Sequence, residues 1–163
     1  HGVVRWGDDA ARRRPEALTA PASCAFHRPV AFWSGWVAAG LILVAALIPV
    51  GHRLGVGKRA RVASPTNRVH VLIGLVTAGL AFLHTLVSVL ALGSPSAVAV
   101  GDLALAAGGL AFLVLIAHTG LGLQLRDPKL RDRVDKRRSH TITALLIVAA
   151  VAAHAVLLLT APT

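Results

Sequence analysis

The chain has 163 residues, of which 55% are hydrophobic and 15% charged, and its formal net charge is +10. This composition excludes an ordinary soluble domain and is typical of a single membrane-embedded domain. The basic residues lie between the apolar stretches and near the N-terminus, so we expect them to orient the chain and to contact lipid headgroups rather than nucleic acid. The chain has one cysteine, Cys24, and no methionine, so any metal site that it builds must depend on histidine.

In chain order, the sequence predicts an arm followed by four spanning helices. Residues 1–29 are rich in Arg, Pro and Ala and favour an extended arm. Four stretches without formal charge follow, each long enough to cross a bilayer as a helix of about 20 residues. The predicted helices cover residues 30–51, 69–93, 103–125 and 140–161. The expected fold is therefore an all-α integral membrane four-helix bundle over residues 30–161.

The connections between these helices differ sharply in charge. The first, residues 52–68, and the third, residues 126–139, are strongly basic, whereas the second contains no Lys or Arg. The positive-inside rule places the basic connections in the cytoplasm and both termini outside, although the arginines of the N-terminal arm point to the opposite orientation. We expect a location in a plasma membrane of bacterial type.

The chain also repeats itself at an offset of 70 residues, which predicts an internal twofold duplication into two helix pairs. The recurring residues are Arg68, His70 and His84 in one half and Arg138, His140 and His154 in the other. The helix before each set carries a histidine near its basic end, His52 or His118. Under this duplication, the two helices with paired histidines run parallel to each other in the bundle.

The spacing of the paired histidines predicts two metal centres at different depths. Fourteen residues of helix rise about 21 Å and leave the two side chains about 40° apart on one face. Parallel helices then bring His70 to His140 at the basic edge and His84 to His154 deeper in the membrane. Two imidazoles can fill both axial positions of a haem iron, which suits electron transfer. We therefore predict two haem b groups with these four ligands.

Other residues near the histidines have more than one interpretation. Gly74 and Gly79 would leave room for a flat macrocycle, although small residues also favour helix packing. Arg68 and Arg138 would pair with haem propionates, or act only as topology signals.

The two remaining histidines of the predicted helices also allow alternatives. His118 lies near the basic edge, where it would contact the haem or a quinone, or replace one of the four ligands. A third haem between His52 and His118 is another alternative, and interfacial packing is the simplest interpretation of His52.

Helices with paired H-x13-H motifs resemble the dihaem core of b-type cytochromes. This group includes the cytochrome b of quinol oxidoreductases, cytochrome b561-like proteins and ferric-reductase transmembrane domains. The resemblance implies electron transfer across the membrane, with a quinone, another redox subunit or a soluble cytochrome as partner. The chain would then be an electron-transfer subunit of an oxidoreductase, for example in a respiratory chain, rather than a stand-alone enzyme. The alternative is a haem-free membrane protein that transports metal ions or protons, or a structural membrane subunit.

Overall fold

The computed structural model describes residues 22–57, 61, 63–91 and 101–160. These residues form four helices and no strand: α1 (Ala22–Val56), α2 (Pro65–Ala91), α4 (Asp102–Gln124) and α5 (Arg133–Thr160). All four are long and apolar enough to cross a membrane. The predicted all-α four-helix membrane bundle is therefore confirmed.

Several helices extend beyond the predicted spans. α1 begins at Ala22, so the last residues of the predicted arm are helical, while residues 1–21 lie outside the described part of the chain. α5 begins at Arg133 rather than at residue 140. The absence of charge marks only the part of a helix that crosses hydrocarbon, whereas Lys and Arg are good helix formers that continue it beyond.

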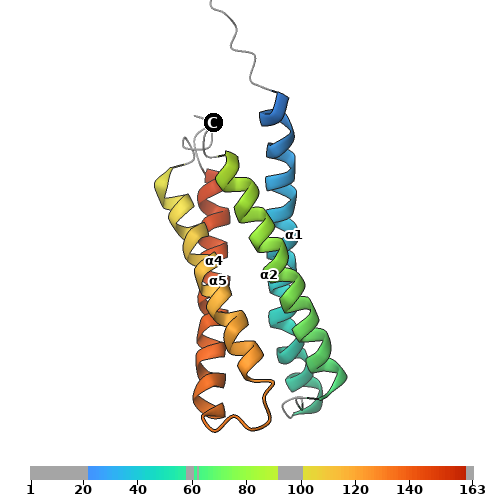
Figure 1. The fold of residues 1–163 in the computed structure, drawn as a ribbon. Coiled ribbons are helices and arrows are strands. Elements are labelled where there is room, and N and C mark those ends of the chain that lie inside the picture. Colours follow the sequence, from blue (N-terminus) through green and yellow to red (C-terminus); the bar gives the residue numbers. More distant parts are fainter. Residues whose placement is uncertain (1–21, 58–60, 62, 92–100, 161–163) are drawn as a thin grey trace, which may run out of the picture.

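The four helices form two antiparallel hairpins, α1 with α2 and α4 with α5 (Figure 1). Each hairpin is closely packed, and the contacts of α2 with α4 and of α1 with α5 are sparser. α2 and α5 therefore lie across a diagonal of the bundle, where their Cα atoms rarely approach within 8 Å. They run in the same direction, as the sequence predicts.

The two ends of the bundle differ in charge. We call the end where α1 and α4 finish and α2 and α5 begin the basic end, and the end where α1 begins and α5 finishes the terminal end (Figure 1). At the basic end, α1 stops at Gly57, whose φ is 67° and whose N–H donates to the Arg53 carbonyl at 2.8 Å. Ser64 then caps α2 through the Asn67 N–H at 3.3 Å, with Pro65 as the first helical residue.

The outer surface of the bundle is apolar. Leu47, Phe82, Leu113 and Leu145 come from different helices and are all more than half exposed. An apolar surface of this extent on every helix requires lipid around it. The described buried residues are mostly small, as in membrane helix packing, where close backbone approach replaces large side chains: Ala38, Thr77, Ala104, Ala111, Leu115, Ile147 and Ala150.

The two hairpins repeat each other at two different offsets. On α1 and α4, Gly35 and Ala38 recur 73 residues later as Gly108 and Ala111, whereas the histidines of α2 and α5 recur after 70 residues. The second hairpin therefore has a connection three residues shorter than the first.

Candidate functional site

The four predicted ligands lie in two levels of the bundle. His70 and His140 are in the basic-end part of α2 and α5, and His84 and His154 are in the terminal-end part. All four side chains are partly buried.

Three of these imidazoles are held by a backbone carbonyl of the other helix in the same hairpin. The bonds join Nδ1 of His70, His84 and His154 to the oxygens of Ala45, Ala31 and Ala104, at 3.0, 3.0 and 2.7 Å respectively. A carbonyl oxygen can only accept, so Nδ1 carries the proton and Nε2 of the neutral ring keeps its lone pair. A metal-binding imidazole is oriented in this way by its second nitrogen.

Glycine makes the two terminal-end carbonyls accessible. In a helix, the side chain of residue i+4 stands over the carbonyl region of residue i, and at both sites residue i+4 is a glycine. A Cβ atom on Gly35 would lie 2.9 Å from Cε1 of His84, and one on Gly108 would lie 2.9 Å from Cε1 of His154. Both distances are shorter than van der Waals contact, so each imidazole occupies the space that a larger residue would fill.

Proline makes the third carbonyl accessible. Pro49 lies inside α1, where its missing N–H would have donated to the carbonyl of Ala45. That oxygen instead accepts the Nδ1–H of His70. The proline thus supplies an acceptor at the level where the basic-end histidine needs one.

The fourth predicted ligand, His140, is held differently. Its Nδ1 is buried and has no hydrogen-bond partner among the described residues. Its ring is stacked on that of His118, with centroids 3.8 Å apart and planes inclined by 13°. His118 Nδ1 is 2.8 Å from Thr143 Oγ1, and this hydroxyl itself donates to a backbone carbonyl of its own helix. His118 therefore donates its Nδ1–H and leaves Nε2 free.

The distances within each level allow one metal ion between two rings. The ring centroids of His70 and His140 are 6.3 Å apart and their planes are inclined by 88°. Two metal–nitrogen bonds of about 2 Å, with about 1.1 Å from each nitrogen to its ring centre, span about 6 Å. His84 and His154 are close enough to each other to interact electrostatically.

The bundle is closed between the two levels. Thr77 and Ile147 lie seven residues after the basic-end histidines and seven before the terminal-end ones, and they are only 2% and 3% exposed. Thr77 Oγ1 donates to the Ile73 carbonyl at 2.7 Å, so its burial leaves no hydroxyl unsatisfied. The two histidine levels are therefore separate sites along one axis.

The other predicted site residues divide into two groups. Gly74 is about 40° around the helix from His70, and a Cβ at Gly74 would meet nothing within 4 Å, so this position has the space that was predicted. Gly79 lies about 180° around the helix from His70 and is exposed, which places it away from the histidine face.

The two predicted arginines also point away from the histidines. Arg68 and Arg138 are already helical and exposed, and each lies about 200° around its helix from the histidine two residues later. The pairing with propionates stays a prediction that this placement does not favour.

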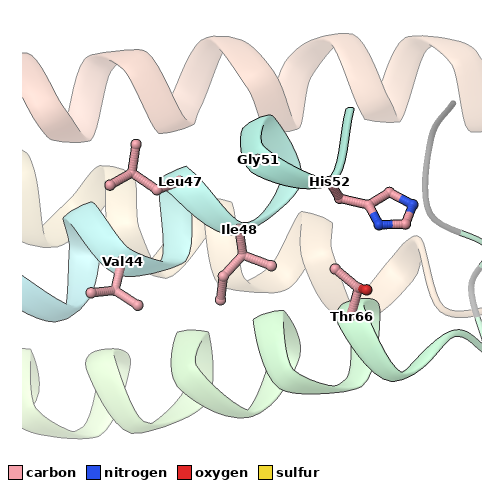
Figure 2. Close-up of a pocket in the computed structure, with 6 residues that line it drawn as sticks. All are labelled: Val44, Leu47, Ile48, Gly51, His52 and Thr66. Atoms are coloured by element: carbon pink, nitrogen blue, oxygen red, sulfur yellow. The ribbon is translucent and has the colours of Figure 1, made fainter. Parts of the chain in front are cut away.

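His52 is not near the histidine levels. Figure 2 shows its imidazole at one end of an open surface groove between α1 and the start of α2. The groove has apolar walls from Val44, Leu47 and Ile48, with Thr66 beside His52. An apolar wall that ends in hydrogen-bonding groups is the chemistry that the predicted quinone would require.

Sequence reasoning missed the residues of α1 and α4 that hold the imidazoles. Their signal was an Ala-x3-Gly pattern, at residues 31–35 and again at 104–108. The predicted equivalence of His52 and His118 does not match the structure, because the 73-residue offset places His118 opposite Ala45.

Fold and site together define an all-α membrane bundle with intramembrane histidines in two levels. Within the described part of the chain, no three His, Cys, Asp or Glu side chains come together as a metal-binding group. Comparisons with protein-family models, with curated proteins and with solved structures found no match to this chain.

Proposed function

We propose that the chain is a dihaem b-type cytochrome that transfers electrons across the membrane. His70 and His140 would hold one haem b at the basic end, and His84 and His154 would hold the second at the terminal end. When bound, the iron of each haem supplies reversible one-electron chemistry. The protein supplies the ligands, the orientation and an environment from which water is largely absent.

The observation that carries this proposal is the fixed Nδ1–H of three of the four histidines. A histidine that serves only in helix packing would be satisfied by one bond from either nitrogen. Here, each bonded ring uses Nδ1 and aims at a carbonyl within its own hairpin, so Nε2 remains as a free base. An ionisable side chain inside the membrane is costly, and the repetition of this arrangement favours a ligand role.

The arrangement of the helices also supports the proposal. α2 and α5 face each other across the diagonal with their backbones apart, and the separation of the His70 and His140 rings matches two axial ligands on one ion. Two-ligand sets suit haem, because the macrocycle provides the remaining four ligands.

The two levels together suggest a path for electrons. They are separated by about 21 Å along the helices, out of a hydrocarbon core of about 30 Å. We propose that the basic end faces the cytoplasm, as the positive-inside rule implies, and that a quinone or another redox protein exchanges electrons with one or both centres.

The test is the haem content of the purified, full chain. We expect a b-type α-band in the reduced-minus-oxidised spectrum and two haems per chain in the pyridine haemochrome assay. A protein produced with ample haem that contains none would overturn the proposal and would favour the haem-free alternative, a transporter or structural subunit.

A further inference from the structure

The basic end contains a third imidazole that the terminal end lacks. His118 occupies the place on α4 that Ala45 occupies on α1, 73 residues earlier. At this place α1 presents a carbonyl to His70. On α4, the side chain of His118 lies flat against His140, whose Nδ1 has no partner among the described residues.

We propose that His118 is a positioning residue for the basic-end centre, which fixes the ring plane of His140 by stacking. This inference rests on the proposed function and names what replaces the carbonyl bond that orients the other three ligands. His118 does not itself touch the iron in this proposal.

Stacking can perform this task because His118 is itself held. Its Nδ1–H donates to Thr143 Oγ1, one turn along α5 from His140. Rotation of the His118 ring would break this bond, and rotation of the His140 ring would lose a 3.8 Å face-to-face contact. On the α4 side, Gly122 limits His140 further, since a Cβ there would lie 3.3 Å from its Cε1.

The ring plane of an axial imidazole can be measured by electron paramagnetic resonance. In a low-spin ferric haem, the angle between the two axial ring planes determines the anisotropy of the g-values. The planes of His70 and His140 are inclined by 88°, so we expect a strongly anisotropic signal with a large maximal g-value from the basic-end haem. The terminal-end haem in the same sample is an internal control for folding.

The experiment compares variants of the full chain. In His118→Ala, the stacking partner is lost, and we expect the maximal g-value of the basic-end signal to shift while both haems remain. In His118→Phe, a flat ring remains, and we expect a signal close to that of the wild type. Thr143→Val removes the bond that holds His118 and should produce a smaller shift. Thr141→Val is the matched control, because its hydroxyl bonds only to the Arg137 carbonyl of its own helix, and it should produce none.

Two results would overturn the inference while leaving the proposed function intact. The first is an unchanged basic-end signal in His118→Ala. The second is loss of the basic-end haem from His118→Ala together with its retention in His140→Ala, which would make His118 the ligand. A wild-type chain without haem would instead overturn the proposed function.

A second measurement does not depend on haem. In haem-free protein, ¹⁵N NMR of the imidazoles should find His118 as the Nδ1–H tautomer, and Thr143→Val should change this. A His118 protonated at Nε2 in the wild type would contradict the role assigned to Thr143.

Discussion

The terminal and basic ends of the bundle hold their histidines by different means. At the terminal end, His84 and His154 have matching environments, each with a carbonyl acceptor and a glycine beneath the ring. At the basic end, His70 uses a carbonyl that Pro49 leaves free, and His140 has a stacked imidazole instead of an acceptor. One repeated hairpin thus provides a matched pair of ligands at one end and an unmatched pair at the other.

The difference indicates which property of each centre the protein controls. A hydrogen bond to Nδ1 makes an imidazole a more basic ligand, so both terminal-end ligands have the same electronic character. At the basic end only His70 has this bond to a carbonyl. We therefore expect the two centres to be spectroscopically distinct, and four changes would sharpen or break this comparison.

The largest expected effect is removal of a ligand at one end. His84→Ala or His154→Ala should each lose the terminal-end haem and keep the basic-end one, because Thr77 and Ile147 close the bundle between the levels. The pyridine haemochrome assay should fall from two haems per chain to one. If the two variants lose different haems, the pairing across α2 and α5 is wrong.

The second expected effect comes from adding a methyl group beneath the terminal-end rings. In Gly108→Ala, the new Cβ would lie 2.9 Å from Cε1 of His154 and would push the ring from its carbonyl. Loss of such a second contact should weaken terminal-end haem binding by about 10–100-fold, measured by haem titration.

The neighbouring glycine provides a matched control for this change. Gly109→Ala meets nothing within 4 Å and makes the same change in helix propensity. Equal haem binding in Gly108→Ala and Gly109→Ala would show that the glycine does not seat the imidazole.

The third effect tests the basic-end acceptor. Pro49→Ala restores an N–H that competes with His70 for the Ala45 carbonyl and removes a helix breaker worth up to about 3 kcal/mol. We expect a higher melting temperature together with a shift in the midpoint potential of the basic-end haem alone. A shift at the terminal-end haem, or none at all, would contradict the role given to Pro49.

The smallest effect tests how closely the terminal-end sites match. Ser34 Oγ lies 3.2 Å from His84 Nδ1, and the equivalent residue on α4 is Ala107, which has no hydroxyl. Ser34→Ala removes one hydrogen bond worth about 1 kcal/mol, so we expect at most a few-fold change in haem affinity at the terminal end. An effect as large as that of Gly108→Ala would mean that Ser34, rather than the Ala31 carbonyl, holds His84.

Much of the fold and part of the site could be predicted from the sequence. The lengths of the uncharged stretches predicted four helices, and the repeated spacing predicted that His70 and His140 lie at one level. The equivalence of His52 with His118 failed, because the shorter connection of the second hairpin changes the offset from 70 to 73 residues between the two pairs of helices. The bounds of α1 and α5 also differ, because basic residues extend these helices past the apolar spans.

The sequence by itself determined which histidines share a helix face and how far apart they lie, because a helix has a fixed rise and twist per residue. Only the tertiary structure decided which group meets each Nδ1, since this depends on how α1 turns toward α2 and α4 toward α5. The contact of His118 with His140 is of this kind: it joins two helices through a rotation that no local pattern specifies. The sequence therefore determined the ligands, and helix packing decided what orients them.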